Sequence, residues 1–472
     1  MSSARVAVIL PYWDFWEASA AAGGLRRERT EVLEQVVDLL ATHSIEAAWQ
    51  GVVDSAPAGK AAAGEVTSSG ANVILVLQTM AVPPAYTTAA LDRIPDLPLV
   101  VWAAQRGQTL RPEFDADDIT RLGATVGVPQ LINVLSRTGR PFSLVVGAHD
   151  DADSVRNAAT TVQAGAVAHD LGQARIARVG RPIAGYDCVD VDSAELRDAT
   201  GIELVPLEPD TIRDLYGQVS DADVAALETE VRAGFEIDVE DSDALARTLR
   251  LAAAMETLDR DHSFDAGAMN CHVDEIRFGA EPGITPCFAL GRETTRGIPW
   301  TCVGDVVTAV AMLVTKGLSG AALYHELEAI DFETNEVAIA NSGEHDLKWC
   351  TAGCTPRLIT NPWFTSDPIT GASAWFELPP GPATMVGFTP HHAEPSGFRL
   401  IAAEGSITER SFPNSPTVGG AFRFAGTDTV TEAWQRWAET GVNHHSAVGP
   451  GHIGGQVATV ARFLGIGFTQ AS

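Results

Sequence analysis

The chain is short of basic residues and of long hydrophobic runs. Its 472 residues carry 32 Lys and Arg against 61 Asp and Glu, which gives a formal net charge of -29. So acidic a surface opposes binding to nucleic acid or to an anionic membrane, because both are negatively charged themselves. No run of about 18 apolar residues occurs, so we predict no transmembrane helix. The composition is 45% hydrophobic, and a chain of this length predicts about three domains.

Cysteine is scarce as well. The six cysteines lack the spacing of a disulfide framework, which favours a reducing compartment over secretion. Cys350 and Cys354 form an isolated pair and make a weak zinc half-site, because structural zinc usually needs four ligands. Only Arg5 precedes the apolar run 6–10, and Pro11 interrupts that run too early for the core of a signal peptide. We therefore predict a cytoplasmic protein.

Two common catalytic motifs are absent. Neither the phosphate-binding sequence G-x-x-x-x-G-K-[ST] nor the G-x-S-x-G nucleophile elbow occurs, so nucleotide hydrolysis and serine-hydrolase chemistry lack sequence support. The segment 449–454 matches G-x-G-x-x-G, but too little chain follows it for a βαβ unit with an acidic residue about 20 positions on. We interpret this segment as a loop and the start of a helix.

Continuous apolar strands alternate with amphipathic helices over much of the chain. Such strands indicate parallel sheets that are covered by helices on both faces. After Gly320 the pattern changes to short strands between glycines and prolines, which is typical of antiparallel sheet. We predict an α/β fold: doubly wound parallel-sheet domains in the N-terminal two thirds, at 1–165 and 166–320, and an antiparallel β-rich C-terminal domain at 321–472. The predicted strands include 6–10, 47–53, 72–77, 99–103, 142–146, 175–179, 202–207, 336–340, 384–388 and 398–403, and the predicted helices include 31–42, 128–137, 152–171, 221–233, 241–258, 432–439 and 456–464.

One stretch organises the candidate chemistry. The segment 297–305 ends in an acidic residue, Asp305, and opens an apolar, helix-like run to Gly320, after which Tyr324-His325-Glu326 follows. Proteins of the α/β class place their chemistry at the carboxyl ends of strands. The distant segment 441–445 ends in two histidines and is the predicted partner of this stretch.

Histidines and carboxylates are the candidate functional residues, since neutral imidazole and ionised carboxylate suit a divalent cation such as Mn²⁺. Glu326 and His345 are candidate ligands, although each taken singly is more often a surface residue. His444 and His445 are adjacent, so on an extended backbone only one of them faces a given site. A solvated polar turn is the alternative interpretation of that pair.

Short motifs across roughly the last three fifths of the chain resemble, in their order, those of the L-fucose/L-arabinose isomerase family. They are 180–187 (GRPIAGYD), 270–272 (NCH), 287–290 (CFAL), 297–299 (GIP), 302–305 (CVGD), 318–320 (LSG), Glu326, 331–333 (DFE), His444-His445 and 464–466 (LGI). The resemblance implies a cytosolic aldose–ketose isomerase with a Mn²⁺-type site and three α/β-rich domains. It also implies a small sugar or polyol as substrate and assembly as a homotrimer or homohexamer.

The same resemblance assigns roles to individual residues. The family has an acidic residue in a Cys-Glu-Gly-Asp motif, a second one farther on and a histidine near the C-terminus. The second acidic residue corresponds to Glu326, as metal ligand and catalytic group, and the histidine to His445, with His444 as the alternative ligand. The first falls on Val303, which neither transfers a proton nor binds a metal. Asp305 is a candidate catalytic replacement if the backbone is extended, and a helix N-cap is its other role.

A further family histidine falls on Asn341, which can bind a substrate hydroxyl or a metal weakly, and His345 is the candidate to compensate. Asn341, His345 and His444 are therefore predicted to bind substrate. Isomerisation through an enediol needs a base for the C2 proton and an acid for the oxygens. The residues at 303 and 341 thus leave two functions open: a metal-dependent sugar isomerase with an ordinary or altered reaction, or a non-catalytic homologue that binds a sugar or a partner.

Overall fold

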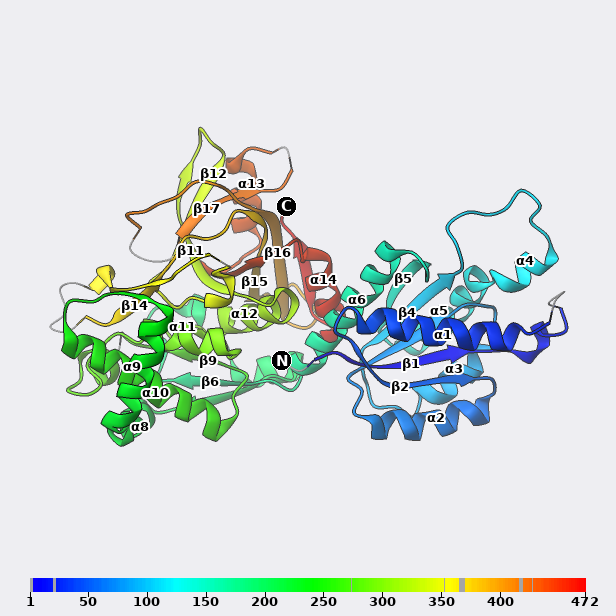
Figure 1. The fold of residues 1–472 in the computed structure, drawn as a ribbon, viewed down its shortest axis with the longest axis horizontal. Helices are drawn as coiled ribbons and strands as arrows, with labels where there is room; N and C mark the ends of the chain where they lie inside the picture. Colours follow the sequence, from blue (N-terminus) through cyan, green and yellow to red (C-terminus); the bar gives the residue numbers. More distant parts are fainter. Residues whose placement is uncertain are drawn as a thin grey trace. The chain divides into compact units, whose positions relative to one another are not determined.

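The computed structural model describes residues 3–19, 23–272, 274–351, 353–364, 370–415, 419–426 and 428–472. The chain divides into two compact units, the first ending at Asp170 and the second covering Leu171–Ser472 (Figure 1). A separate third domain beginning at residue 321 stays a prediction.

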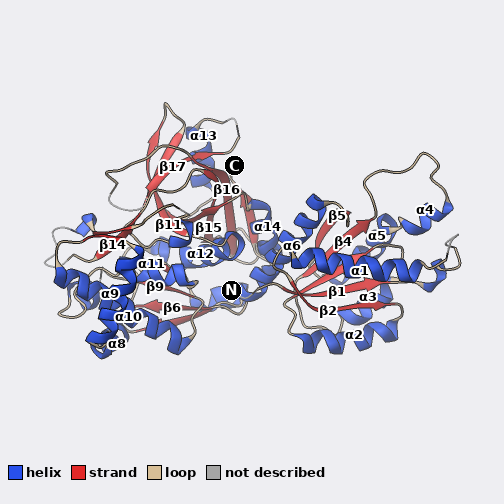
Figure 2. Ribbon diagram, in the orientation of Figure 1, coloured by secondary structure: helices blue, strands red, loops and turns tan. Residues whose placement is uncertain are grey.

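The first unit is a doubly wound parallel sheet. Its strands lie in the order β2-β1-β3-β4-β5, and all four neighbouring pairs are parallel. They are β1 (Arg5–Pro11), β2 (Glu46–Val53), β3 (Val73–Gln78), β4 (Leu99–Gln105) and β5 (Ser143–Ala148). The helices between and after them are α1 (Leu25–Ala41), α2 (Ala56–Ser69), α3 (Pro84–Leu91), α4 (Ala116–Arg121), α5 (Ala124–Thr138) and α6 (Ala152–Leu171), as Figure 2 shows.

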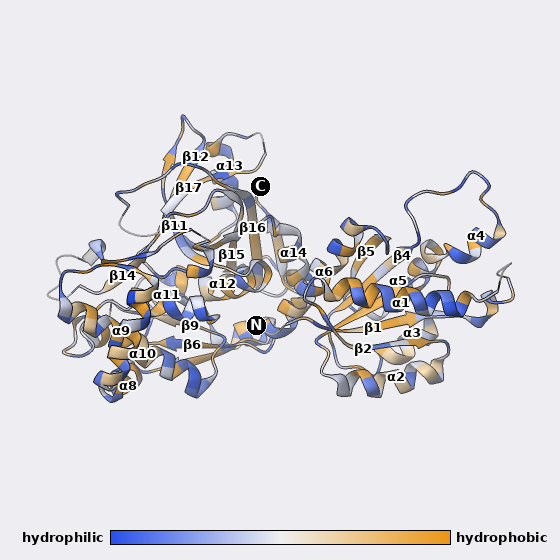
Figure 3. Ribbon diagram, in the orientation of Figure 1, coloured by the Kyte–Doolittle hydropathy of each residue, from blue (hydrophilic) through white to orange (hydrophobic). Residues whose placement is uncertain are grey.

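Burial on both faces explains the continuous apolar strands of this unit. Side chains such as Ile9 and Val76 pack in one core with residues of α2, α3 and α5. On the opposite face, Gly165 of α6 approaches the side chain of Val73. Both faces are therefore covered by helices, and β1 is strongly hydrophobic along its length (Figure 3). The helix predicted at 128–137 was placed one turn too late, since α5 begins at Ala124 and contains Pro129 in its interior.

The second unit begins with another parallel sheet, in the order β10-β9-β6-β7. Its strands are β6 (Arg175–Val179), β7 (Glu203–Leu207), β9 (Ala266–Met269) and β10 (Trp300–Thr301). The helices are α7 (Ser193–Thr200), α8 (Pro209–Gln218), α9 (Asp221–Gly234), α10 (Ser242–His262), α11 (Cys287–Arg296) and α12 (Val306–Ser319). A small sheet in the order β14-β13-β8 joins β8 (Glu236–Asp238) to β13 (Arg357–Thr360) and β14 (Ala372–Trp375).

The C-terminal part of this unit is a closed antiparallel barrel of six strands. The strands follow the order β15-β18-β11-β12-β17-β16, and β16 pairs with β15 to close the ring. They are β11 (Leu323–Asp331), β12 (Glu336–Ala340), β15 (Gly381–Pro390), β16 (Phe398–Ile407), β17 (Gly419–Phe424) and β18 (His445–Pro450), and β19 (Gly467–Gln470) adds in parallel to β16. The helices α13 (Val430–Glu439) and α14 (Gly454–Leu464) complete it. The predicted fold class is thus confirmed. The G-x-G-x-x-G segment begins with the last two residues of β18, Gly449 and Pro450, and only from Gly451 on is it the loop and helix start that we interpreted.

Helix α12 links the parallel sheet to the barrel. It packs against β9, β10 and β6 of the sheet and against β18 and β15 of the barrel. Ten consecutive residues, 306–315, are buried, which is the pattern of a helix covered on all sides. The start of α12, at Asp305, is therefore held from both sides.

Two further findings bear on the predictions made from composition. No helix in the described part of the chain is long and apolar enough to span a membrane. Cys350 and Cys354 are joined by a disulfide bond, so they are not a zinc half-site.

Candidate functional site

Three loops meet at one edge of the second parallel sheet. They follow β6, β9 and β10, and the carboxyl ends of parallel strands lie at the same edge. The side-chain amide of Asn270, after β9, donates to the carbonyl oxygen of Arg181, after β6. The Sγ atoms of Cys271 and Cys302, after β9 and β10, lie 3.5 Å apart. Motifs far apart in the sequence are neighbours because each one ends a parallel strand.

The loop after β10 is a tight turn that ends in a helix cap. Val303 and Gly304 have φ angles of 49° and 75°, and the amide of Asp305 donates to the carbonyl oxygen of Cys302 at 3.0 Å. Oδ1 of Asp305 accepts from the amide of Thr308 at 2.8 Å and caps α12. The N-cap role is therefore confirmed. The premise of an extended backbone is wrong, because the left-handed residues turn the chain between positions 303 and 305.

His445 lies between two carboxylates. Its Nδ1 atom is 2.8 Å from Oδ2 of Asp305, and its Nε2 atom is 2.7 Å from Oε1 of Glu326. Glu326 and His445 are directly paired residues of β11 and β18. The hydroxyl of Tyr324 lies 2.7 Å from Nδ1 of His445, and Asn443 donates to Oδ2 of Asp305 at 2.9 Å. Asp305 is fully buried and His445 is 5% exposed, so water screens this contact little.

The two carboxylates control the charge of the imidazole. Burial lowers the pKa of His445, but its hydrogen bonds to Asp305 and Glu326 outweigh burial and raise the pKa to about 9. The hydrogen bond from His445 in turn lowers the pKa of Glu326, which is therefore ionised at neutral pH. Burial raises the pKa of Tyr324 well above its ordinary value, so its hydroxyl keeps its proton.

His444 also lies in this cluster, contrary to the expectation that only one of the two histidines faces the site. The ring centroids of His444 and His445 are 3.8 Å apart, and Nε2 of His444 is 4.0 Å from Oε1 of Glu326. Oδ1 of Asn443 accepts from the backbone amide of His444 at 2.8 Å, and β18 begins only at His445. The chain therefore turns at His444 instead of extending through it. Burial and the charge of His445 lower the pKa of His444, which favours its neutral form.

Asn341 and His345 both lie in the loop after β12, and their predicted substrate contacts stay predictions. Asn341 follows Ala340, the cross-strand partner of Glu326. Its Nδ2 atom is buried and has no hydrogen-bond partner in the described part of the chain. His345 is fully buried, burial lowers its pKa to about 3, and its nitrogens do not join the cluster of Glu326, His444 and His445.

Sequence reasoning missed the roles of Tyr324, Asn443 and Glu328. Tyr324 and Glu326 are two apart on β11 and share a face, so this spacing was an available signal, whereas Glu328 lies at the register shift between Leu327 and Ala329. Burial and the neighbouring carboxylate of Glu326, with which it shares a hydrogen bond, raise the pKa of Glu328. The pair therefore holds one carboxylate ionised and its neighbour more readily protonated.

The donor atoms fit a divalent cation. Glu326, His444 and His445 each offer one ligand atom, and these atoms lie within 4.8 Å of one another. One oxygen and two nitrogens are a donor set that Mn²⁺ and similar cations accept. Asp305 supplies the carboxylate that commonly orients a metal-binding histidine through its other nitrogen. Val303 contributes no ligand.

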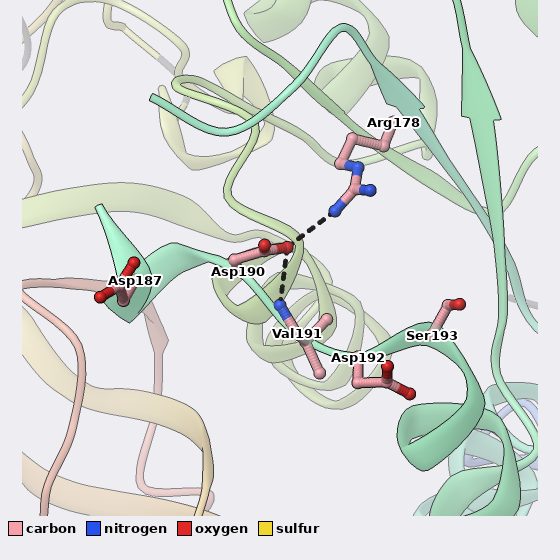
Figure 4. Close-up of a pocket in the computed structure, with 6 residues that line it drawn as sticks. All are labelled: Arg178, Asp187, Asp190, Val191, Asp192 and Ser193. Carbon is pink, nitrogen blue, oxygen red and sulfur yellow. Dashed lines mark hydrogen bonds and ion pairs between the residues drawn. The ribbon is translucent and has the colours of Figure 1, made fainter. Parts of the chain in front are cut away.

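A polar pocket of about 460 Å³ adjoins the loop after β6. Figure 4 shows the guanidinium of Arg178 directed at the carboxylate of Asp190, at 2.8 Å. The same loop carries Cys188, whose Sγ lies 3.7 Å from Nδ1 of His444, and Tyr186, whose ring packs edge-on against His444. The loop therefore connects this pocket with the histidine cluster.

Comparison with known proteins agrees with this description. No family model matches the chain. The L-arabinose isomerase of a Nocardioides species is 24% identical over 374 residues, which are 75% of this chain and 72% of that enzyme. The chain is thus a sugar isomerase-like protein. Within that class it is a distant homologue of L-arabinose isomerase, which confirms the family resemblance seen in its motifs.

Proposed function

We propose that the protein binds a Mn²⁺-type cation through Glu326, His445 and His444 and catalyses an aldose–ketose isomerisation, or a closely related proton transfer, on a sugar or polyol. The observation that carries this proposal is the placement of His445 between Asp305 and Glu326. A carboxylate behind the imidazole and a second carboxylate beside its other nitrogen are the arrangement of an oriented metal ligand. The homology to L-arabinose isomerase supports the same chemistry.

The residues divide the work as follows. A bound divalent cation would hold neighbouring oxygens of the substrate and polarise its carbonyl group. Glu326, ionised because of His445, takes the proton from C2 to give an enediol and returns it to C1. Glu328, whose pKa is raised, is the acid that gives a proton to O1 as the enediol forms, and it takes the proton of O2 as the ketone forms. Asp305 positions His445 and is not the proton-transfer group, because both of its oxygens are engaged and it is fully buried.

We place the enzyme in the cytoplasm, because its six cysteines lack a disulfide framework and four of them are free beside the single Cys350–Cys354 bond. Its ligand would be a small sugar or polyol. We further propose that it assembles as a homotrimer or homohexamer, as the family resemblance implies.

A non-catalytic sugar-binding homologue is the second candidate, and Val303 is the observation that favours it. A valine at this position removes one of the two acidic residues that the family motif carries. Its side chain is buried and apolar, so it supplies no group for proton transfer. The two candidate functions differ in the role of Glu328, which transfers protons in the isomerase and has no such task in the binding homologue.

Two measurements on the purified chain test the proposal. The first is the content of bound metal in wild type and in His445→Ala, which should lose Mn²⁺ and melt at a lower temperature because binding stabilises the folded state. The second is exchange of the C2 proton of arabinose or fucose with deuterated solvent, in wild type and in Glu328→Gln. Metal binding without exchange supports the binding homologue. Equal metal content in wild type and His445→Ala refutes the metal assignment.

A further inference from the structure

A second cluster of metal-binding side chains lies at the same sheet edge. Cys271 and His272 follow β9, and Cys302 follows β10, the neighbouring parallel strand. One ligand atom from each of the three lies within 4.8 Å of the other two. Both cysteines are buried, whereas His272 is exposed and gives the cluster a route to solvent. No residue is shared with the cluster of Glu326, His444 and His445.

A buried carboxylate adjoins these cysteines. Glu344, in the loop after β12, is fully buried, and within the described residues neither carboxylate oxygen has a hydrogen-bond partner at ordinary distance. Cys271 and Cys302 both act on the pKa of this carboxyl group, although its oxygens are not among the cluster atoms that lie within 4.8 Å of one another. A buried, unpaired carboxylate is strongly unfavourable, and in folded proteins such groups are paired with charge or coordinate a metal. Such a carboxyl group is either neutral or compensated by a positive charge, and a cation at this place would supply that charge.

We propose that Cys271, His272, Cys302 and Glu344 bind a thiophilic divalent cation, with Zn²⁺ as the best match. Two sulfurs, one imidazole nitrogen and one carboxylate oxygen make the four ligands that Zn²⁺ takes in tetrahedral sites. A Zn–S distance of about 2.3 Å places two tetrahedral thiolates about 3.8 Å apart. The observed separation of 3.5 Å is close to that value. Thiolate ligands also select zinc over manganese, so this site is chemically distinct from the one proposed above.

Such a cation would fix the candidate active site. It would join the loops after β9 and β10 to the loop after β12, and Cys302 directly precedes Val303. Val303 is a β-branched residue with a positive φ of 49°, a conformation that persists only where the surroundings impose it. A metal clamp on Cys302 supplies that constraint and so holds Asp305 in its place against His445.

Cobalt substitution tests the proposal on the full chain. Protein purified under reducing conditions is stripped with a chelator and titrated with Co²⁺, which gives a sulfur-to-cobalt charge-transfer absorption only when thiolates coordinate it. We expect this absorption at one cobalt per chain and its loss on adding one equivalent of Zn²⁺. Cys302→Ser should lower the absorption per cobalt to half or less, because only the thiolate of Cys271 remains. Glu344→Gln should weaken Zn²⁺ binding by about 100-fold or more, because loss of a direct ligand exceeds the 10- to 100-fold effect of outer-shell changes.

Two control variants separate this site from other parts of the molecule. Cys188→Ser removes an exposed cysteine outside the cluster and should leave the absorption intact. His445→Ala should leave it intact as well, so that failure of the proposed isomerase site and failure of this one are distinguishable. Circular dichroism of every variant verifies folding, and the wild-type titration needs no variant at all.

The results that overturn the proposal are equally definite. Absence of the absorption in reduced wild type does so, as does its retention at full intensity in Cys302→Ser. A disulfide between Cys271 and Cys302 in freshly purified protein, seen by mass spectrometry of a non-reduced digest, would assign this pair to redox chemistry and would also overturn it.

Discussion

Replacement of Asp305 by asparagine separates orientation of His445 from capping of α12. Asparagine is as good an N-cap as aspartate, so its remaining oxygen can still accept from the amide of Thr308. The other oxygen becomes an NH₂ group that faces Nδ1 of His445 and the amide nitrogen of Asn443, both of which now donate to Asp305. In the neutral imidazole, which is the form that binds a metal, this conflict is relieved when the proton moves from Nδ1 to Nε2.

That change of tautomer removes the ligand atom. Nε2 is the nitrogen beside Glu326, and a protonated Nε2 cannot bind a cation. Loss of an outer-shell carboxylate typically lowers metal affinity 10- to 100-fold, which is about 1.4 to 2.7 kcal/mol. We expect Asp305→Asn to weaken Mn²⁺ binding by at least this factor. The melting temperature of the metal-free protein should change only by the amount that follows from the loss of the effect of Asp305 on the pKa of His445.

Isothermal titration with Mn²⁺ measures the effect, and Asp241→Asn is its matched control. Asp241 is the N-cap of α10, and its side chain accepts from the backbone amides of Asp243 and Ala244. It should bind Mn²⁺ like wild type. An Asp305→Asn protein with the wild-type dissociation constant, or an equal loss in Asp241→Asn, would refute the orienting role of Asp305.

Three further predictions concern pH, position 303 and assembly. In metal-free protein the pKa of His445 is about 9 when folded, against 6.5 for an ordinary histidine, so its stabilising charge is fully present below about pH 6.5 and is lost as the pH rises to about 9. The loss is at most about 3 kcal/mol, which corresponds to about 5 °C in melting temperature for a unit of about 300 residues. His445→Gln should flatten the fall of melting temperature between about pH 6.5 and pH 9. An unchanged pH dependence of the melting temperature would contradict the assignment. We expect only faint C2 exchange by the wild type, because position 303 carries no acidic group. Val303→Glu should raise this exchange by a factor on the order of 10² to 10⁴, whereas Val303→Gln, which has the shape of glutamate without its charge, should not. Strong exchange by the unmutated protein would show instead that Glu326 and Glu328 suffice. Sedimentation at micromolar concentration should give a trimer or hexamer, and a clean monomer would count against the assembly proposed here.

Local sequence patterns determined most of the secondary structure. Continuous apolar strands and 3.6-residue periodicity are properties of neighbouring residues, so they indicated the parallel sheets, and the Gly- and Pro-punctuated strands after Gly320 indicated antiparallel sheet. Asp305 was recognisable as a helix cap because capping depends only on the residues that follow it. The candidate ligands Glu326 and His445 came from motif order, which sequence carries directly.

Only the tertiary structure decided which side chains meet. The pairing of β11 with β18 sets Glu326 opposite His445, although more than one hundred residues separate them, and no local pattern encodes that register. Long-range packing equally decides the closure of the barrel and the turn that brings His444 beside His445. It also brings Cys271, Cys302 and the buried Glu344 into one region. Burial follows from the same long-range packing, and burial together with charged neighbours sets the pKa values at this site. The sequence thus specified the chemical groups, and the packing of the sheet against the barrel specified their distances and charges.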